Sequence, residues 1–434
     1  MKIAVLGSGG REHALTWKLE QSNLVTKVYT IPGNGGTRNN VNIDLRDFEK
    51  IKQFCLKEKI DLIFVGPEDP LVNGIVDFFS DTGIKVFGPD KTGALLEGSK
   101  IFAKRFMRQY GVATADFWEF GNISFDEGLL NYKSEDLSKF ANTPKKYQKV
   151  IDKLQGNCVI KYNGLAAGKG VYVCNCREEA QKAIIDIQYK YGTEASYLIE
   201  EKLLGDELSI LAFTDGIDYQ LLQPSQDHKQ LLENDKGPNT GGMGAFCPVP
   251  FFTPKLKSAI VQDIIKPTLQ GIQQERMNYR GVLYFGLMIT ESGPKLLEYN
   301  VRLGDPETEV VLPALKNDFA QLVLSCFDGS LPELKMQFHQ ETYIDVVLVS
   351  GGYPYEYKKG YQIFGLDNIA DDVILFHAGT KKENQKIFTA GGRVLNVVAQ
   401  AESLNEAIQK AYERVNKFHF KKMFYRKDIG KRRK

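Results

Sequence analysis

The chain has 434 residues, of which 43% are hydrophobic and 25% charged, and its formal net charge is +2. This balance is ordinary for a globular protein and predicts no general attraction to nucleic acid or to a membrane. Single hydrophobic cores stop growing near about 250–300 residues, so we expect more than one domain.

Residues 1 to about 100 alternate short apolar runs with helical patterns. This alternation predicts a parallel sheet flanked by helices, with ligands bound at the carboxyl edge of its strands. The expected strands are Lys2–Leu6, Lys27–Ile31, Leu62–Val65 and Lys85–Phe87, and the expected helices are Glu12–Gln21 and Phe48–Lys59.

The first strand leads into a glycine-rich loop, Gly7-Ser8-Gly9-Gly10, which is followed by Arg11 and Glu12. Phosphate groups bind well at such a helix start, and Arg11 favours a sugar phosphate. Glu12 stands where a dinucleotide fingerprint needs its third glycine, so a nicotinamide cofactor is disfavoured. A tight turn needed only for packing is the alternative interpretation of this loop.

A helix is expected at Ser99–Tyr110, followed by a polar stretch at 122–155 that we interpret as a surface elaboration with a helix near Lys145–Leu154. The strand around Lys161 then runs into the glycine loop Gly164–Gly170, and another strand follows at once. A P-loop would be followed by a helix, so the pattern predicts a hairpin whose glycine tip folds over phosphates as a flap.

Three further segments offer ligand-binding groups. The strand from Ser196 ends in exposed backbone at Glu201–Leu203, which can pair with the edge of adenine, and Glu207 could accept hydrogen bonds from ribose hydroxyls. The segments Ser225–Lys229 and Gly237–Ala245 combine polar side chains with glycines, whose backbone approaches anions closely.

The sharpest candidate site is the pair Glu298 and Asn300, which lies on the second of two apolar strands, after Val282–Ile289. Residues two apart on a strand project from the same face. A carboxylate and an amide oxygen can hold Mg²⁺ and leave its other positions for phosphate. The alternative is a strand end with solvated polar residues.

The last region opens with a strand at Tyr343–Val349 and is rich in glycine. It ends with a helix near Leu404–Lys417 and a basic tail, Lys431–Lys434, that we expect to be solvated.

The six cysteines contain no C-x-x-C pair, and no apolar run reaches the ~18 residues of a membrane-spanning helix. We therefore expect reduced thiols, no signal peptide and a cytoplasmic location.

Taken together, these motifs resemble the phosphoribosylamine–glycine ligases, or glycinamide ribonucleotide synthetases, of the ATP-grasp superfamily. The resemblance covers nearly the whole chain. It is carried by Gly7–Ala14, Gly66–Glu68, Val159–Gly170, Ser225–Lys229, Gly237–Ala245, Arg302–Glu307, Gly351–Pro354, His377–Thr380, Gly391–Val394 and Arg426–Gly430.

The resemblance implies a mixed α/β and α+β multidomain fold. Its parts would be a parallel α/β pre-ATP-grasp domain at 1–100, a two-part ATP-grasp region at 101–326 and a small α+β domain at 327–434. It also implies an ATP-dependent ligase of de novo purine biosynthesis that joins glycine to 5-phosphoribosylamine through glycyl phosphate. Mg²⁺ or Mn²⁺ would be the metal and ATP the co-substrate. We favour a monomer.

The residues implied by the resemblance fall into four groups. Catalytic roles are expected for Lys161, Arg302 and Asp305. ATP would be held by Lys104, Lys161, Gly168, Lys169, Gly170, Glu200, Glu201, Leu203 and Glu207. The other substrates would be held by Gly9, Gly10, Arg11, Glu12, Asp227, Lys229, Asn239 and Thr240, and the metal by Glu298 and Asn300.

The sequence departs from the family pattern after the lysine strand, where Tyr162-Asn163 stands in place of Ala-Asp, and the stretch 122–155 is longer than usual. Two other functions are weighed against the ligase. An ATP-grasp carboxylase would activate bicarbonate, and a non-catalytic nucleotide sensor would lack an intact metal pair.

Overall fold

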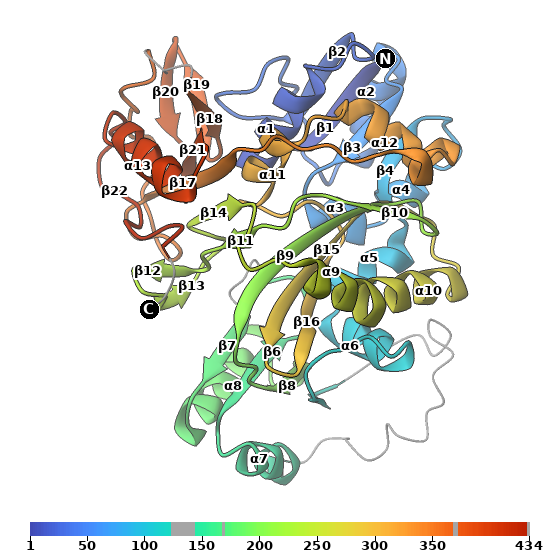
Figure 1. The fold of residues 1–434 in the computed structure, drawn as a ribbon, viewed down its shortest axis with the longest axis vertical. Coiled ribbons are helices and arrows are strands. Elements are labelled where there is room, and N and C mark those ends of the chain that lie inside the picture. The colour runs from blue at the N-terminus through green and yellow to red at the C-terminus, as the bar shows by residue number, and fades with distance from the viewer. Residues whose placement is uncertain (123–143, 167–169, 368–371, 432–434) are drawn as a thin grey trace.

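The structure is a computed structural model that describes residues 1–122, 144–166, 170–367 and 372–431. Figure 1 shows the N-terminal region in blue beside the C-terminal region in orange and red, with the green and yellow middle of the chain below them. The basic tail beyond residue 431 lies outside the described residues. Within the described part of the chain, no helix has the length and apolar character needed to cross a membrane.

The N-terminal region forms the predicted parallel sheet, in which β1 lies between β2 and β3 and β4 pairs with β3. Four consecutive residues of β1, from Ile3 to Leu6, are buried, as expected when helices cover both faces of a parallel sheet. The strands are β1 (Lys2–Gly7), β2 (Lys27–Pro32), β3 (Leu62–Val65) and β4 (Lys85–Pro89), and the helices are α1 (Gly10–Leu19), α2 (Phe48–Glu58), α3 (Glu68–Val72), α4 (Ile75–Phe78) and α5 (Lys91–Gly98).

This sheet continues into the middle of the chain, because β15 pairs with β4 in antiparallel orientation, opposing Tyr279 to Pro89. The result is one eight-stranded sheet that joins the N-terminal region to the strand carrying Glu298 and Asn300. The added strands are β9 (Asp206–Thr214), β10 (Tyr219–Leu221), β15 (Tyr279–Thr290) and β16 (Gly293–Asn300). Helices α9 (Pro254–Ile260) and α10 (Lys266–Gln274), with a π-helical turn between them, accompany these strands (Figure 1).

A separate four-stranded antiparallel sheet has the order β5-β8-β6-β7. Its strands β6 and β7 form the predicted hairpin, although the tip at 167–169 lies outside the described residues. Most of the polar stretch, residues 123–143, also lies outside them. The elements are β5 (Phe117–Phe120), α7 (Pro144–Lys153), β6 (Cys158–Tyr162), β7 (Val171–Cys174), α8 (Arg177–Tyr191) and β8 (Tyr197–Glu201), and α6 (Lys100–Gln109) leads into this sheet.

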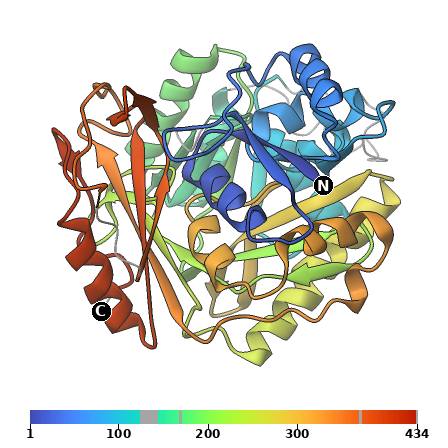
Figure 2. The ribbon, with the colours of Figure 1, turned by 90° about the horizontal axis from the view of Figure 1, so that it is seen from above.

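The C-terminal sheet includes two strands from the middle of the chain, because β14 pairs with β17 and β11 pairs with β14. Its order is β11-β14-β17-β21-β18, with β22 on β17. The elements are β11 (Gln226–Asp227), β14 (Gly244–Cys247), β17 (Thr342–Ser350), β18 (Val373–His377), β21 (Arg393–Ala401), α13 (Leu404–Val415) and β22 (Met423–Phe424). Outside this sheet lie β12 (Gln230–Leu232) paired with β13 (Lys236–Asn239), β19 (Thr380–Glu383) paired with β20 (Lys386–Thr389), and helices α11 (Thr308–Ala314) and α12 (Phe319–Asp328). Figure 2 shows α13 on the outside of this sheet, remote from the N-terminal helices.

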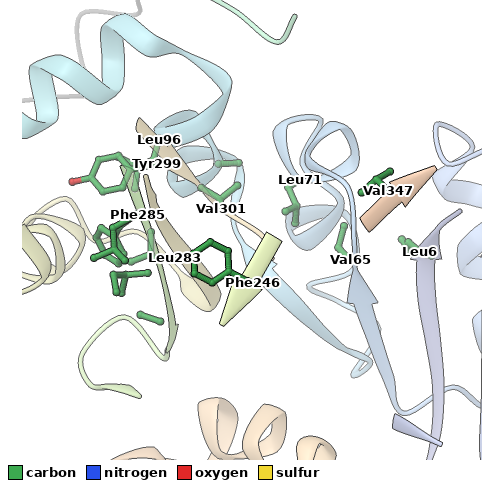
Figure 3. Close-up of a cluster of buried hydrophobic side chains, with 14 of the residues drawn as sticks. Leu6, Val65, Leu71, Leu96, Phe246, Leu283, Phe285, Tyr299, Val301 and Val347 are labelled. Carbon is green, nitrogen blue, oxygen red and sulfur yellow. The ribbon is translucent and has the colours of Figure 1, made fainter. Parts of the chain in front are cut away.

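A common apolar core joins the two large sheets. Figure 3 shows Leu6 of β1, Phe285 of β15, Tyr299 of β16 and Val347 of β17 as members of one buried cluster. Burying this surface favours a fixed arrangement of the two sheets. The small sheet has its own cluster, which includes Phe120, so its packing depends less on the rest of the molecule.

The C-terminal region also depends on a close crossing of two glycine-containing loops. The N–H of Gly379 donates to the carbonyl of Arg393 at 2.9 Å, and the N–H of Gly391 donates to the carbonyl of Gly379 at 3.1 Å. A Cβ atom on Gly379 would lie 2.6 Å from the Arg393 carbonyl oxygen and would collide with the Gly391 backbone. The glycines of the motifs His377–Thr380 and Gly391–Val394 therefore allow the two backbone segments to pack closely against each other.

We predict that Gly379→Ala lowers the free energy of unfolding by about 2 kcal/mol or more, because a methyl group must displace backbone atoms. Gly360→Ala is the matched control: it has a positive φ of 85° but open space around the added Cβ, so about 1 kcal/mol of conformational strain is expected. Chemical denaturation measures both. Equal losses for the two variants would contradict the proposed packing role.

Candidate active site

Two lysines from different elements meet at one buried carboxylate. Lys104 of α6 and Lys161 of β6 place their Nζ atoms 3.0 and 3.1 Å from Oε2 of Glu200, which lies on β8. Glu200 is 1% exposed, and none of the described residues gives its other oxygen a hydrogen bond. Burial opposes ionisation of this carboxylate, but the two lysines outweigh burial and lower the pKa of Glu200.

Both ammonium groups keep one donor for a ligand. Lys104 also donates to the hydroxyl of Thr114 at 2.7 Å, and Lys161 donates to the carbonyl of Leu297 at 3.1 Å. An ammonium group has three N–H donors, so the described residues occupy two of them on each lysine and leave one. Burial lowers the pKa of Lys104 to about 8 despite the opposing charge of Glu200. The pair can therefore bind an anion such as a phosphate.

The same contacts join the small sheet to the strand that carries the predicted metal ligands. Thr114 donates to the carbonyl of Leu296 at 2.6 Å, and Lys295 forms an ion pair with Glu201 at 3.1 Å. Together with the bond from Lys161 to Leu297, these contacts hold β16 against the end of β6 and β8. Lys104 and Lys161 consequently lie near the strand that carries Glu298.

Glu298 and Asn300 lie on β16 on the same face, with buried Tyr299 between them, as predicted. Burial opposes ionisation of Glu298, but Lys229, Lys161, Lys100 and Arg302 surround it and lower its pKa. The described residues give neither side chain a hydrogen bond or an ion pair, so their oxygens are available. This pair of hard oxygen donors fits Mg²⁺ or Mn²⁺.

The metal would need more ligands than the protein supplies. Within the described residues, no group of three or more His, Cys, Asp or Glu side chains could hold a metal ion. A metal at Glu298 and Asn300 would therefore complete its coordination with phosphate or water oxygens, as Mg²⁺ commonly does.

Arg302 is held on three sides. It donates to Glu68 at 3.1 Å, to Glu97 at 2.7 Å and to the carbonyl of Leu303 at 3.2 Å. Burial opposes ionisation of Glu68, but Arg302 and Arg11 outweigh it and lower its pKa to about 2. For Glu97 burial is the larger effect and raises its pKa to about 7, although Arg302 favours the charged form. The guanidinium is thus oriented by two N-terminal carboxylates, and donors of its terminal nitrogens remain for a ligand.

The substrate residues predicted in the 225–245 segment lie close together. Thr240 donates through both its N–H and its hydroxyl to the carbonyl of Lys229 at 2.8 Å, and Asn239 precedes it. Lys229 forms an ion pair with Glu207 at 3.2 Å. Although burial disfavours its charge, the neighbouring carboxylates of Asp227 and Glu207 raise the pKa of Lys229 well above its ordinary value.

The N-terminal loop lies against the segment that follows β16. Arg11 donates to the side chain of Glu12 at 2.6 Å and to the carbonyl of Leu303 at 3.1 Å, while the N–H of Gly9 donates to Glu12 at 2.6 Å. Glu12 therefore closes the turn, and Arg11 bridges the N-terminal helix to residue 303. Both side chains are buried.

Gly10 has a packing reason as well. A Cβ atom at this position would lie 2.8 Å from the amide oxygen of Asn396 on β21 and would collide with the carboxylate of Glu309 on α11. Both interpretations of the loop from the sequence, as a phosphate site and as a tight turn required for packing, are thus compatible with the structure.

Sequence reasoning missed three groups that the structure brings into the site. Lys100 lies on α6 one turn before Lys104 and contributes to the field around Glu298. Arg393 pairs with Asp305 at 3.0 Å and donates to the carbonyl of Gly241 at 2.6 Å. Glu68 and Glu97 orient Arg302. The i, i+4 spacing of Lys100 and Lys104 was the available signal for the first of these.

Glu201 and Leu203, which were predicted to meet adenine, lie at the end of β8 and just beyond it. The N–H of Glu201 donates to the carbonyl of Asp116 at 3.0 Å, so it is not available to a ring nitrogen of adenine, whereas the Glu201 carbonyl could accept from the adenine amino group. Leu203 follows at the exposed end of this strand. Gly170 is buried at the base of the hairpin, whereas Gly168 and Lys169 lie outside the described residues.

Comparison with known proteins agrees with this architecture. Models of phosphoribosylglycinamide synthetase match the chain in three parts, as N domain (residues 1–97), ATP-grasp (A) domain (98–308) and C domain (343–432). The phosphoribosylamine–glycine ligase of Clostridium acetobutylicum is 45% identical over 99% of this chain and 100% of its own length. That of Halalkalibacterium halodurans is 44% identical over 99% and 96% of the two chains.

Among solved structures, the phosphoribosylamine–glycine ligase of Thermotoga maritima superposes with a TM-score of 0.80 at 35% identity, covering 99% of this chain and 100% of that one. The fold and the lysine–carboxylate site define an ATP-grasp ligase. More narrowly, the chain belongs to the phosphoribosylglycinamide synthetase family.

The pKa of Lys104 gives a pH prediction. Below about pH 8 this lysine is charged and attracts phosphate, and above it the charge is lost, so the affinity for a non-hydrolysable ATP analogue should fall as the pH rises through 8. Lys104→Gln should bind weakly at every pH and lose this inflection. Calorimetric titrations between pH 6.5 and 9.5 measure the affinity for the ATP analogue, and Lys182→Gln, at an exposed position, is the control. An inflection that persists in Lys104→Gln would contradict the assignment.

Proposed function

We propose that the chain joins glycine to 5-phosphoribosylamine with ATP, giving glycinamide ribonucleotide, ADP and phosphate in purine biosynthesis. The observation that carries this proposal is the buried lysine pair on Glu200, held opposite the oxygen pair Glu298 and Asn300. Cations on one side and metal-binding oxygens on the other suit a phosphoryl transfer to a carboxylate. The names of the full-length relatives supply the substrates.

ATP would lie between the small sheet and β16. Its adenine would meet the backbone of Glu201 and Leu203, and its ribose would meet Glu207. Its phosphates would meet Lys104 and Lys161, the latter in a catalytic role. Gly168, Lys169 and Gly170 of the hairpin would cover the phosphates and keep water from the acyl phosphate.

Mg²⁺ or Mn²⁺, held by Glu298 and Asn300, would offset the phosphate charge that repels a carboxylate nucleophile. A glycine carboxylate oxygen attacks the γ-phosphorus of ATP, the bond to the ADP oxygen breaks, and glycyl phosphate forms. Lys161 and Arg302 stabilise the charge on the transferred group. The phosphoribosylamine nitrogen then attacks the acyl carbon, phosphate leaves, and the nitrogen loses a proton.

The sugar phosphate would bind at the loop of Gly9, Gly10, Arg11 and Glu12. This loop lies beside Asp305: a Cβ on Gly9 would be 3.3 Å from its carboxylate. We assign Asp305 to the attacking amine on this ground, because a carboxylate there can accept hydrogen bonds from it. Asp227, Lys229, Asn239 and Thr240 would hold the substrates from the opposite side.

The alternative candidate is a carboxylase that activates bicarbonate. The biotin carboxylase domain of Hydrogenobacter thermophilus 2-oxoglutarate carboxylase superposes with a TM-score of 0.69. That match has 15% identity and reports the fold alone. A nucleotide sensor without catalysis is disfavoured by the available oxygens of Glu298 and Asn300. We further propose a cytoplasmic, monomeric enzyme.

The substrate assignment is tested by ADP release with phosphoribosylamine generated in situ. Release should require glycine and should not respond to bicarbonate. Glycine-independent release stimulated by bicarbonate would support the carboxylase instead, and ATP binding without any turnover would support the sensor.

Glu298→Gln should abolish turnover or reduce it by about 100-fold or more while the thermal unfolding profile stays close to that of the parent, because the change removes the charge that anchors the metal but keeps the volume. Rates are measured across a Mg²⁺ titration. Glu291→Gln, at the exposed turn of the same hairpin, is the matched control. Unchanged activity of Glu298→Gln at limiting Mg²⁺ would refute the metal assignment.

A further inference from the structure

The position at which this chain departs from its family pattern, Asn163, makes three side-chain hydrogen bonds. Its Oδ1 accepts from the backbone N–H of Ile101 at 3.1 Å and from the hydroxyl of Ser99 at 3.0 Å. Its Nδ2 donates to the hydroxyl of Ser196 at 3.1 Å. Because a backbone N–H can only donate, the bond to Ile101 fixes which end of the amide faces α6.

The Ser99 hydroxyl extends this contact into the helix. Ser99 is the N-cap of α6, and its Oγ also accepts from the N–H of Phe102 at 3.1 Å. Asn163 therefore satisfies one of the unpaired N–H groups that every helix start carries and orients the residue that satisfies another. The first turn of α6 is held by a side chain from the hairpin.

A second bond runs in the opposite direction. The ammonium of Lys100, the first residue of α6, donates to the carbonyl of Gly164 at 3.2 Å. Gly164 has a φ of 150°, which favours glycine, and it begins the turn that leads to the hairpin tip. Residues 99 to 101 thus contact residues 163 and 164 through three separate bonds.

Tyr162 fixes the hairpin on its other side. Its ring stacks on Tyr191 of α8 with centroids 3.7 Å apart and an interplanar angle of 9°. The chain leaving β6 is thereby held between α6 and α8. Tyr162 and Asn163, the two residues that differ from the family pattern, therefore both stabilise the base of the hairpin.

These contacts connect the two elements that carry the phosphate-binding lysines. Lys161 lies two residues before Asn163, while Lys100 and Lys104 lie on the first turns of α6, to whose start Asn163 is hydrogen-bonded. We propose that Asn163 is a positioning residue that fixes the lysines of α6 relative to Lys161 and so sets the geometry for phosphoryl transfer. This inference rests on the proposed function of the site.

The chemistry explains why an amide can replace the carboxylate that we expected at this position. Both bonds to α6 use an acceptor oxygen, which aspartate and asparagine share. The amide adds a donor for Ser196, whereas with aspartate the Ser196 hydroxyl could donate instead. The role therefore needs an acceptor at residue 163 and does not need a negative charge.

The test compares Asn163→Ala, Asn163→Asp and Ser196→Ala by steady-state ADP release and by calorimetric affinity for a magnesium-bound, non-hydrolysable ATP analogue. Asn163→Ala should lower kcat/KM for ATP by about 10–100-fold, as expected for the loss of two hydrogen bonds at a helix start. The KM for glycine at saturating ATP should stay within about threefold of the parent. Asn163→Asp should restore kcat/KM for ATP to within about threefold.

Ser196→Ala is the matched control, because it removes the bond on the Nδ2 side and leaves both bonds to α6. It should retain near-parental kinetics. Parental kinetics of Asn163→Ala, failure of Asn163→Asp to rescue, or a loss in Ser196→Ala equal to that in Asn163→Ala would each overturn the proposal. If Asn163→Ala does not fold, Asn163→Ser decides, since its short hydroxyl cannot reach both partners.

A double-mutant cycle separates positioning from simple stability. Lys100→Met and Asn163→Ala should be non-additive in analogue affinity if Asn163 acts through the α6 lysines, and additive effects would overturn the proposal. The affinity measurement does not depend on glycine. A parent enzyme without glycine-dependent ADP release would therefore refute the proposed function, while the affinity comparison would still decide the role of Asn163.

Discussion

The site depends on the buried carboxylate of Glu200, which holds two ammonium groups from two different elements. Each ion is nearly inaccessible to water, so the buried carboxylate and the two ammonium groups compensate one another's charge. Removing the carboxylate would leave two uncompensated buried cations, a far larger cost than losing an exposed ion pair. The position of α6 against β6 and β8 is therefore constrained by the same carboxylate that compensates the charge of both lysines.

The fold places this site where its parts meet. The eight-stranded sheet brings β16, which carries Glu298 and Asn300, into register with β15 and, through it, connects it to the N-terminal strands. The large sheets share an apolar core, whereas the small sheet has its own core and contacts β16 mainly through Lys161, Thr114 and Lys295. The part of the molecule with the shared core thus carries Glu298 and Asn300, the proposed metal ligands, and a separately packed unit carries Lys161 and the glycine hairpin. This arrangement suits a site that must admit ATP and then exclude water.

Much of the fold follows from local sequence patterns. The sequence predicted the N-terminal strands, the hairpin at β6 and β7, and the β15–β16 pair with Glu298 and Asn300 on one face. Each of these depends on a hydrophobic pattern within one contiguous segment. Pairings between distant segments were not predictable. Nothing local in Tyr279 or in the 244–247 segment indicates that β15 extends the N-terminal sheet or that β14 joins the C-terminal one. The same holds for side chains such as Arg393 and Asn163, whose roles depend on partners more than sixty residues away.

The central claim is that glycine is activated through its carboxylate by ATP, and oxygen transfer tests it most directly. The enzyme is incubated with ATP, phosphoribosylamine generated in situ, and glycine carrying ¹⁸O in both carboxylate oxygens, and the released phosphate is analysed by mass spectrometry. The account predicts that each phosphate formed contains one ¹⁸O atom from glycine, because the P–O bond made in the first step is kept when the amine displaces phosphate. Phosphate without the label, formed at the same rate as the product, would contradict an acyl phosphate route.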